Sequence, residues 1–247
     1  MQLSKRLKTV ADMVPVCDTV ADIGCDHAHT SIYLVENKRV KRAIAMDVNE
    51  GPLERARENI VHCHMEEQIE TRLSDGAKEL APKEADTLLI SGMGGLLMMR
   101  ILDESREVLD SATNLVLQPQ SDIESVRKYL HEHGFVIENE DMLTDGGKRY
   151  NIILAKHGKE EYTNPVFYRY GKILLEKKNV SLKEFLDYGK EKYPRIIDAI
   201  SGEIEIALKE KRELTPKEQE RMQKNEQSLS KMREEYNLLV KALEFYS

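Results

Sequence analysis

Short runs of β-branched and apolar residues alternate with longer stretches of helical periodicity over the first 155 residues. Because a period of two indicates a strand and a period near 3.6 indicates a helix, this pattern predicts seven strands. They cover residues 18–24, 42–48, 69–74, 85–91, 114–119, 135–143 and 149–157. The helical stretches between them cover residues 28–38, 50–65, 95–108 and 121–133. Such alternation is typical of a mostly parallel α/β sheet with helices on both faces.

The connection between the last two predicted strands differs from the others. TDGGK, residues 144–148, contains the adjacent glycines of a tight hairpin turn. We therefore expect the seventh strand to pair antiparallel with the sixth, at or near one edge of the sheet. A parallel sheet that ends in such a hairpin resembles the Rossmann-like fold of class I S-adenosylmethionine-dependent methyltransferases. Since one fold hosts many activities, the activity has to be argued from the site.

The C-terminal part of the chain lacks strand signals and is rich in charged residues and helix formers. We expect helices around 165–178 and 181–192, followed by two antiparallel helices packed as a coiled-coil hairpin. The first of the two carries a weak apolar stripe, and ELTPKE at 213–218 separates it from the second, with Thr215 as N-cap and Pro216 in the first turn. The second follows a heptad whose seam residues are Met222, Asn225, Leu229, Met232, Tyr236, Leu239, Leu243 and Tyr246.

This change of pattern predicts two domains. Residues 1–158 are expected to form a cofactor-binding methyltransferase domain, and residues 159–247 a helical coiled-coil domain. The second domain is expected to bind nucleic acid, although it could instead only pack on the first domain or form a dimer.

Composition and charge narrow the class of protein. The chain has 247 residues, 40% of them hydrophobic, and a net charge of −7. Residues 1–155 hold 18 Lys and Arg against 27 Asp and Glu, whereas residues 156–247 hold 19 against 17, so only the second part is net positive. Three scattered cysteines make a disulfide framework unexpected. The N-terminus lacks the apolar core of a signal peptide, and no apolar run is long enough to span a membrane. We expect a cytoplasmic protein, with a monomer favoured.

The turn after the first predicted strand is the first candidate for a binding site. It reads Asp22-Ile23-Gly24-Cys25-Asp26, with one glycine where a dinucleotide fingerprint has three. Two carboxylates beside that glycine would repel a diphosphate but would attract a cationic ligand such as S-adenosylmethionine. The alternative is that Asp26 only caps the helix that starts near His27.

Carboxylates also follow the second and third predicted strands. Asp47, 23 residues after Gly24, is placed to accept hydrogen bonds from ribose hydroxyls, and the segment continues with Val48 and Asn49. Asn49 is expected to be the N-cap of the next helix. Asp75, Gly76 and Ala77 follow the third strand, where the carboxylate could accept from an adenine amino group; the alternative is an ordinary β-turn. Three carboxylates at three successive strand ends are more specific than any one alone.

The segment after the fourth predicted strand is where the acceptor of a methyl group is expected. It contains Ser91, Gly92, Met93 and Gly94. It lacks the proline pair and aromatic residue that methyltransferases acting on exocyclic base amines often have there. A ring nitrogen such as adenine N1 has an in-plane lone pair already, so the enzyme need only position it and exclude water. The alternative is a loop kept small for close packing.

The sequence contains three His-x-His pairs, a spacing found in some metal sites, at 27/29, 62/64 and 131/133. No Cys or carboxylate spacing joins them, so no metal site is predicted.

These residues resemble the bacterial tRNA (adenine-22 N1)-methyltransferase family over the whole chain. ISGMGG and LQPQSD together are the specific part of the resemblance. The matching stretches are LSKRL at 3–7, ADIGCDHA at 21–28, AMDVNEGPL at 45–53, RLSDG at 72–76, ISGMGG at 90–95, LQPQSD at 117–122 and DGGKRYNII at 145–153. One departure is DHAHTS at 26–31, in which His29 stands where the family often has an aromatic residue.

The resemblance implies methyl transfer from S-adenosylmethionine to N1 of an adenine in the tRNA D-arm. The base must then leave its pair or stack to expose N1. Asp26 is expected to orient the N6 amino group, with Gly92, Met93 and Gly94 positioning the base. Cofactor contacts are expected from Asp22, Gly24, Cys25, Asp26, Asp47, Val48, Asn49, Asp75, Gly76, Ala77, Ser91 and Gly92.

Binding of the tRNA polyanion would require basic surfaces. The expected RNA contacts are Lys5, Arg6, Lys8, His29, Lys148 and Arg149, with Lys209, Lys211, Arg212, Lys217, Arg221 and Lys224 added by the C-terminal domain. Two alternatives remain open: a methyltransferase acting on a protein or small molecule, and a non-enzymatic RNA-binding module. The single glycine and the hairpin both argue against a nicotinamide dehydrogenase.

Overall fold

The computed structural model describes residues 3–209 and 215–247, and the chain divides into two compact units. One unit ends at Thr163 and the other runs from Asn164 to Ser247, so the division lies close to the boundary expected after residue 158.

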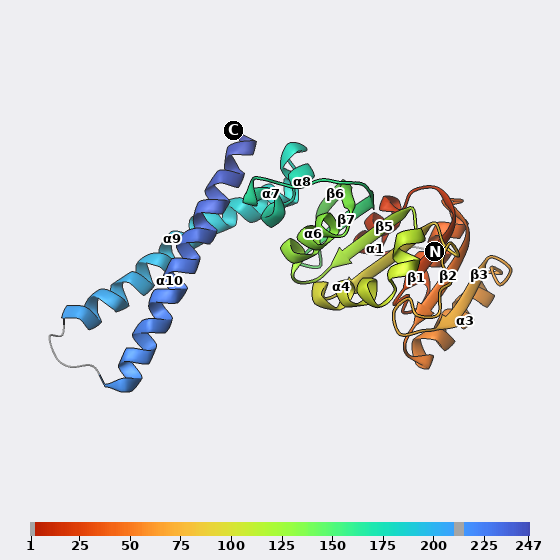
Figure 1. Ribbon diagram of the computed structural model, residues 1–247, viewed down its shortest axis with the longest axis horizontal. Helices are drawn as coiled ribbons and strands as arrows, with labels where there is room; N and C mark the ends of the chain where they lie inside the picture. Colours follow the sequence, from red (N-terminus) through yellow and green to blue (C-terminus); the bar gives the residue numbers. More distant parts are fainter. Residues whose placement is uncertain (1–2, 210–214) are drawn as a thin grey trace. The chain divides into compact units, whose positions relative to one another are not determined.

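The first unit contains a seven-stranded sheet with the order β3-β2-β1-β4-β5-β7-β6 (Figure 1). Its strands are β1 (Cys17–Ile23), β2 (Val40–Asp47), β3 (Ile69–Leu73), β4 (Thr87–Met93), β5 (Asn114–Pro119), β6 (Phe135–Asp145) and β7 (Lys148–His157). β7 runs antiparallel to both β5 and β6, whereas the pairs among β1 to β5 are parallel. The predicted strands and the antiparallel hairpin are confirmed. β7 lies between β5 and β6, so β6 forms the edge.

Helices cover both faces of this sheet. One face carries α1 (Lys5–Met13), α2 (His29–Glu36) and α3 (Glu50–His62). The other carries α4 (Gly95–Glu104), α5 (Arg106–Ser111) and α6 (Ile123–Glu132). The single helix expected at 95–108 is therefore wrong in one respect, because the helix breaks at Ser105 and continues as α5.

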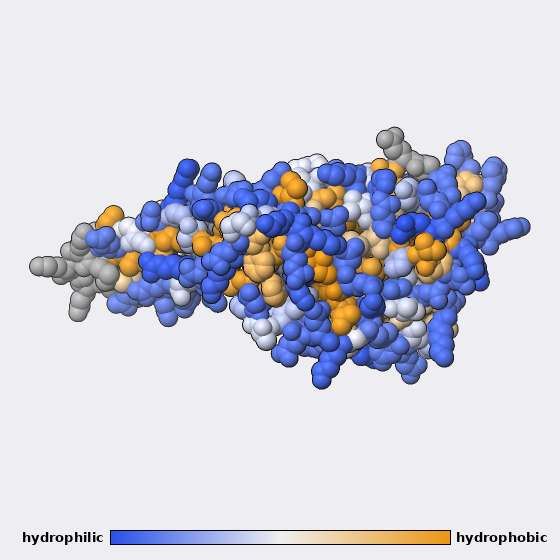
Figure 2. Space-filling model, turned by 90° about the horizontal axis from the view of Figure 1, so that it is seen from above, coloured by the Kyte–Doolittle hydropathy of each residue, from blue (hydrophilic) through white to orange (hydrophobic). Residues whose placement is uncertain are grey.

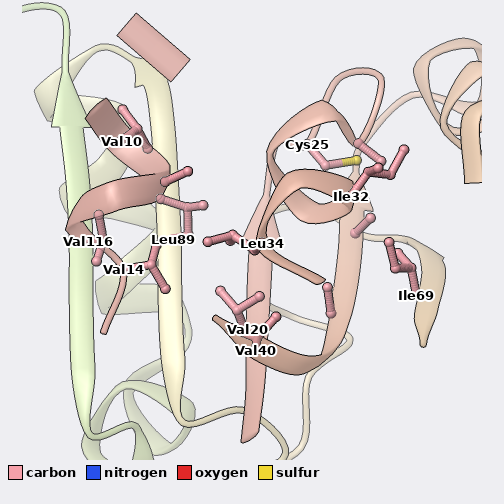
Figure 3. Close-up of a cluster of buried hydrophobic side chains, with 14 of the residues drawn as sticks. Val10, Val14, Val20, Cys25, Ile32, Leu34, Val40, Ile69, Leu89 and Val116 are labelled. Carbon is pink, nitrogen blue, oxygen red and sulfur yellow. The ribbon is translucent and has the colours of Figure 1, made fainter. Parts of the chain in front are cut away.

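The hydrophobic core follows from the alternation of side chains along the strands. Leu89 and Val116 point to the face covered by α1 and α2, where they join Val10 and Val14 (Figure 3). Their neighbours in sequence, such as Leu88, are equally buried on the opposite face. Strands buried on both faces are apolar at nearly every position, as is typical of parallel sheets.

The second unit is helical within its described residues. It contains α7 (Pro165–Tyr170), α8 (Lys172–Glu176), α9 (Val180–Lys209), α10 (Pro216–Leu243) and a short 3-10 helix η1 (Glu244–Tyr246). The helix expected at 165–178 is interrupted at Gly171, which has a φ of +90°. The helix expected at 181–192 does not end there. α9 is 30 residues long and continues through Pro194.

α9 and α10 pack side by side as an antiparallel pair (Figure 1). Tyr193 donates to Glu235 at 2.7 Å near one end of the pair, and Arg221 pairs with Glu203 at 2.9 Å toward the other. The predicted heptad positions of α10 are buried or half-buried. Thr215 caps α10 in a capping box with Glu218, as predicted for the cap. The coiled-coil geometry stays a prediction, and Lys211 and Arg212 lie outside the described residues.

The described residues were also compared with the features of membrane-spanning helices and of metal sites. Within 3–209 and 215–247, no helix has the length and apolar character needed to cross a membrane. The same residues contain no cluster of three His, Cys, Asp or Glu side chains suited to a metal ion. All three cysteines are free thiols.

Candidate functional site

The carboxyl ends of the four central parallel strands meet at one edge of the sheet. In the register, Ile23 of β1 lies beside Met46 of β2 and Ile90 of β4, and Asp47 of β2 lies beside Leu73 of β3. The predicted site segments follow these ends, so the structure brings them together. Ligands of open α/β sheets bind at this edge, where the strand order reverses between β1 and β4.

The turn after β1 is held tightly against β2 and β4. The N–H groups of Gly24 and Cys25 both donate to the Met46 carbonyl, at 2.8 and 2.9 Å. Gly24 has a φ of +77°, and a Cβ there would overlap with Cε of Met93. The positive φ explains the glycine at position 24, because residues with a side chain rarely adopt it, whereas the Met93 methyl is the end of a flexible side chain.

Asp22 is the buried carboxylate of the site. Only 3% of its surface is exposed, and Oδ2 accepts a hydrogen bond from Ser31 Oγ at 2.7 Å. Burial raises the pKa of Asp22 to about 6, partly offset by the Ser31 hydrogen bonds, and the Asp47 charge raises it further. A cationic ligand would place a positive charge beside this carboxylate and stabilise its ionised form.

Asp26 lies in the same turn but in the opposite environment. Its side chain is 78% exposed, with Oδ1 3.2 Å from His27 Nε2. The alternative role as a helix cap is wrong, because α2 begins at His29, with Ala28 as N-cap and no side-chain capping bond. Asp26 and Ala28 both have left-handed φ values, 52° and 57°. An alanine in that region costs about 1–2 kcal/mol, so the surroundings hold this turn in a specific shape.

The segment after β2 has an ordered carboxylate. Asp47 is half-buried, and its Oδ1 accepts from the backbone N–H of Asn49 at 3.0 Å. Asn49 is the N-cap residue of α3, as predicted, although its side chain makes no capping hydrogen bond. Val48 between them is 59% exposed, which leaves an apolar side chain free to cover a flat ligand.

The segment after β3 is fixed to the same edge. The N–H of Ser74 donates to the Asp47 carbonyl at 2.9 Å, and Ala77 is buried. Gly76 has a φ of +66°, and a Cβ there would lie 2.9 Å from Ile101 Cγ2 of α4. Asp75 is exposed, and Lys78 at 2.5 Å lowers the pKa of its carboxyl group. Its carboxylate thus faces solvent with one oxygen already paired.

ISGMGG and LQPQSD, the stretches that carry the specific part of the family resemblance, lie against each other in the structure. Ser91 Oγ lies 3.3 Å from Gln118 Oε1, and the N–H of Gln120 donates to the Met93 carbonyl at 2.8 Å. The ladder between β4 and β5 is irregular between Ser91 and Met93, and Gly92 has a φ of +85°. Ser91, Gly92 and Met93 therefore belong to the end of β4 itself, and only Gly94 lies beyond it.

Sequence reasoning missed the residues that complete this part of the site. Gln118 is fully buried, and its Oε1 accepts from Arg6 Nη1 at 2.8 Å. The Arg6 guanidinium also lies 5.5 Å from the centroid of the Tyr150 ring. A Cβ on Gly92 would be 3.4 Å from Arg6 Nη1 and 3.7 Å from Gln120 Nε2. The residues are present in LQPQSD and in LSKRL at 3–7, but no spacing connects these two stretches.

The predicted basic residues divide into two environments. Arg6 is turned toward Gln118, and its backbone N–H donates to Asp145 of the β6–β7 hairpin at 3.0 Å. Lys5 donates to the Thr144 carbonyl at 3.4 Å, so the start of α1 lies against the hairpin that exposes Lys148 and Arg149. Lys8 is also exposed and pairs with Asp12 at 2.6 Å.

His29 occupies the first position of α2, half-buried. Its ring centroid lies 5.5 Å from that of His27, and its Nδ1 is buried without a hydrogen-bond partner among the described residues. Burial lowers the pKa of His29, and the neighbouring His27 lowers it further. The ring is therefore neutral at pH 7 and presents an aromatic surface. Cys25 is not a nucleophile, because burial raises the pKa of its thiol far above the usual range.

The edge combines the buried carboxylate of Asp22 and the three more exposed carboxylates of Asp26, Asp47 and Asp75 with a close-packed glycine turn. The absence of a triple-glycine cradle, together with these negative charges, disfavours a diphosphate. The raised pKa of Asp22 and the exposed Val48 fit a cationic ligand that also carries a flat ring. The residues predicted from the sequence to bind the cofactor therefore lie along one edge of the sheet.

Comparison with known proteins agrees with this chemistry. A family profile described as methyltransferase domain matches residues 3–153. The tRNA (adenine(22)-N(1))-methyltransferase of Bacillus subtilis is 34% identical over 161 residues, which are 65% of this chain and 68% of that protein.

Solved structures extend the similarity over nearly the whole chain. The crystal structure of the B. subtilis m1A22 tRNA methyltransferase superposes with a TM-score of 0.81 at 27% identity, covering 98% of this chain and 99% of that one. Streptococcus pneumoniae Sp1610 in complex with S-adenosyl-L-methionine superposes with a TM-score of 0.78 at 27% identity, covering 98% and 100%. The chain belongs to the bacterial tRNA (adenine(22)-N(1))-methyltransferase family.

Proposed function

We propose that this protein transfers a methyl group from S-adenosylmethionine to N1 of an adenine in tRNA, at position 22 of the D-arm. The observation that carries the proposal is that Ser91–Gly94 pack against Gln118 and Gln120, beside the carboxylate-lined turn that follows β1. This arrangement places a compact acceptor site next to a site for a cationic methyl donor, in a chain whose family carries out this reaction.

Asp22, Gly24 and Asp47 would hold the cofactor. S-adenosylmethionine supplies an electrophilic methyl group on a sulfonium when bound. The buried Asp22 carboxylate is suited to the cationic end of the ligand, and Asp47 to the ribose hydroxyls. Val48 and Ala77 would enclose the adenine ring, with the Asp75 carboxylate at its amino group. Cys25, Asn49 and Gly76 would contribute through the backbone that shapes these turns.

The acceptor site needs positioning more than acid–base chemistry. Adenine N1 attacks through its own lone pair, so no deprotonation precedes the transfer. Gly92 and Gly94 pack closely, since a Cβ there would lie 3.4 Å from Arg6 Nη1 and 3.2 Å from Ser121 Oγ, and Met93 lies against Gly24, where it would separate the two ligands. Orientation of this kind contributes several kcal/mol to a transfer reaction, up to about 7–11 in favourable cases.

Asp26 is proposed to accept a hydrogen bond from the adenine N6 amino group. Methylation at N1 makes the ring cationic, and a carboxylate nearby stabilises that charge as it develops. Asp26→Ala should lower kcat while leaving the cofactor Kd unchanged, and Asp26→Asn should retain part of the activity. Full turnover by Asp26→Ala with unchanged cofactor affinity would show that the role is wrong.

The tRNA is proposed to contact basic surfaces on both units. In the first unit these are Lys5, Lys8, Lys148 and Arg149. In the second, Lys217 is exposed, whereas Arg221 and Lys224 pair with Glu203 and Glu220. α9 adds a shallow groove lined by Tyr188, Glu191, Lys192, Arg195 and Ile196, in which Lys192 Nζ lies 5.4 Å from the centroid of the Tyr188 ring. Cations beside an exposed aromatic ring suit an RNA strand.

The decisive experiment is methylation of unmodified tRNA by the purified protein, followed by mapping of the modified nucleotide and atom. We expect N1-methyladenosine at position 22. Methylation of protein or small molecules but not of tRNA would favour the alternative activity, and cofactor binding without any transfer would favour a binding module. Action in the cytoplasm as a monomer is part of the same proposal, and sedimentation of the free protein tests the monomer.

A further inference from the structure

One polar side chain beside the proposed acceptor site has no hydrogen-bond partner among the described residues. The stretches ISGMGG and LQPQSD contain five polar side chains. Ser91 Oγ donates to Gln118 Oε1 at 3.3 Å, and Ser121 Oγ donates to Asp122 Oδ2 at 2.7 Å. The fifth, Gln120, is exposed, and within residues 3–209 and 215–247 its amide makes no hydrogen bond. This amide is therefore free to bind a ligand.

The backbone that carries the Gln120 amide is held in place. Hydrophilic side chains cover most of the surface that Figure 2 shows, so exposure alone does not distinguish a polar residue. Gln120 differs because its N–H donates to the Met93 carbonyl at 2.8 Å, and the preceding Pro119 is paired with Met93 in the sheet. On its other side, Ser121 Oγ accepts from the N–H of Gly95 at 3.3 Å. The amide thus extends from a support that fixes its position.

Gln120 and the turn after β1 lie on the two sides of β4. In the strand order, β4 stands between β1 and β5. Asp26 lies in the turn after β1, and Gln120 directly follows β5. A Cβ on Gly92, near the end of β4, would be 3.7 Å from Gln120 Nε2. A base bound at the end of β4 would therefore meet Asp26 on one side and the Gln120 amide on the other.

The neighbouring amide of Gln118 cannot take the same role, because it is used inside the protein. Gln118 is fully buried. Its Oε1 accepts from Arg6 Nη1 at 2.8 Å, and its Nε2 donates to the Pro119 carbonyl at 3.3 Å. Gln118 supports the acceptor site, whereas Gln120 is placed to contact what binds there.

The chemistry of the proposed reaction restricts how an adenine can be recognised. N1 has to face the methyl group, so no donor of the protein can occupy its lone pair. The Hoogsteen edge stays accessible, and it presents the N7 acceptor beside an N6–H donor. A glutamine amide matches this edge with one donor and one acceptor, as in the bidentate contacts of Asn and Gln with adenine. Guanine presents two acceptors there, O6 and N7, which the amide cannot match in this way.

We propose that Gln120 recognises the Hoogsteen edge of the target adenine, with Nε2 donating to N7 and Oε1 accepting from the N6 amino group. This inference rests on the proposed function and adds a residue that selects adenine over guanine. The other N6 hydrogen, on the N1 side, remains for Asp26. N1 itself stays unpaired and turned toward the methyl donor.

The test pairs a change in the protein with the removal of one atom from the substrate. Full-length proteins methylate tRNA with adenine at the target position, and the same tRNA with 7-deazaadenine there, which keeps N1 and N6 but lacks N7. The measured quantity is the ratio of kcat/KM on adenine to kcat/KM on 7-deazaadenine. Any effect of 7-deazaadenine on the reactivity of N1 or on the fold of the tRNA is common to all the proteins, so it cancels when their ratios are compared.

Two variants remove the donor to N7. Gln120→Glu is nearly isosteric and still accepts from N6, and Gln120→Leu removes both contacts. The wild-type ratio should exceed that of each variant by about fivefold or more, the factor expected for one hydrogen bond. Gln120→Glu adds a negative charge that weakens binding of both RNAs alike, so its ratio reports only the contact to N7.

Gln68→Leu is the matched control. Gln68 is also an exposed glutamine with a fixed backbone, because its N–H donates to the Met65 carbonyl at 3.0 Å and its carbonyl accepts from Ala43 at 2.9 Å. It directly precedes β3, at the amino end of that strand and away from the functional edge. Gln68→Leu should keep the wild-type ratio.

Calorimetry with S-adenosylmethionine verifies that each variant is folded, and the cofactor Kd should be unchanged. Gln120→Glu keeps the test valid if Gln120→Leu does not fold. Equal ratios in the wild type and in the folded Gln120 variants would overturn the proposal, as would a Gln68→Leu ratio that falls with them. A wild-type protein that methylates neither RNA would instead contradict the proposed function.

Discussion

Asp22 is the residue whose environment most clearly reports the kind of ligand the site takes. Its carboxylate is buried, and the hydrogen bonds from Ser31 do not offset the cost of burial, so its pKa rises to about 6. A buried group of this kind costs the protein stability when it ionises. In the free protein, the contribution of Asp22 to stability is present below the unfolded pKa and is lost as pH rises through about 6. In the proposed cofactor site, a bound cation would pair with this charge.

The raised pKa of Asp22 predicts a pH-dependent affinity for the cofactor. A cationic ligand favours the carboxylate, so binding below about pH 6 must release the proton that Asp22 holds in the free protein. The Kd for S-adenosylmethionine should therefore rise as pH falls, by up to about tenfold per pH unit. Calorimetry in buffers of different ionisation enthalpy measures both the Kd and the proton released. Asp22→Asn should bind more weakly and lose this pH dependence; a pH-independent Kd in the wild type would contradict the assignment.

Arg6 carries a second prediction at this scale, because it joins α1 to the acceptor site through Gln118. Arg6→Lys keeps the positive charge but loses the planar guanidinium that donates to Gln118 Oε1 and lies near Tyr150. We expect kcat to fall about tenfold, near the ~1.5–3 kcal/mol typical of one charged hydrogen bond, with the cofactor Kd unchanged. Lys148→Ala, on the exposed hairpin, should instead raise KM for tRNA and leave kcat alone. If both variants changed only KM, Arg6 would be an RNA-binding residue and not a positioning one.

The difference between predicted and missed site residues has a physical basis. Hydrophobic periodicity locates strand ends, and ligands of parallel sheets bind there, so the sequence predicts Asp22, Asp47 and Asp75 as site residues. Gln118 and Tyr150 were missed because their roles depend on Arg6, a partner more than 100 residues away in the chain. Which strand ends become neighbours is decided by the strand order, and the amino-acid pattern does not encode that order locally.

At the scale of elements, the sheet was more predictable than the helical unit. Each strand was predicted because its apolar run is bounded by turn residues. The sequence prediction ends a helix at residue 192, just before Pro194, a residue that removes a backbone donor and normally ends a helix. α9 continues through Pro194 because α10 packs along it, with Gly189 against Leu239 and Tyr193 bonded to Glu235. Packing against α10 thus keeps α9 helical in spite of its proline. At Gly171 the helix breaks, and the hydrophobic pattern of the sequence does not indicate that break.

The close approach of α4 to the loop before α6 gives a prediction about two glycines. Gly95→Ala places a Cβ 2.6 Å from the Ser121 carbonyl oxygen and 2.9 Å from Val126 Cγ2. We expect a loss of about 1–3 kcal/mol in the free energy of unfolding, as for other overpacked sites. Gly51→Ala is the matched control, since it lies in the first turn of α3 with nothing within 4 Å of its Cβ. That variant should be slightly more stable, by up to about 1 kcal/mol. Urea denaturation of both variants decides, and equal stability would mean that the α4 contact yields without cost.

At the scale of the whole molecule, the charge distribution sets how an acidic protein binds a polyanion. The first 155 residues carry a net charge of −9 (18 Lys and Arg against 27 Asp and Glu), and the remainder carries +2 (19 against 17). Removing residues 164–247 should therefore weaken tRNA binding at least about tenfold while leaving the Kd for S-adenosylmethionine unchanged. The first unit has its own sheet and core, so circular dichroism and cofactor binding verify that the truncated protein is folded.

The salt dependence of the same two proteins tests where the phosphates are held. Each neutralised phosphate contributes about 0.7–0.9 to the slope of log K against log salt. If the second unit contacts several phosphates, the full chain must show the steeper slope, and the truncated chain must retain only the part due to Lys5, Lys8, Lys148 and Arg149. Parallel slopes with equal affinities would place all RNA binding on the first unit. In that case α9 and α10 would serve association between copies of the chain, and sedimentation of the full and truncated proteins would then show different oligomeric states.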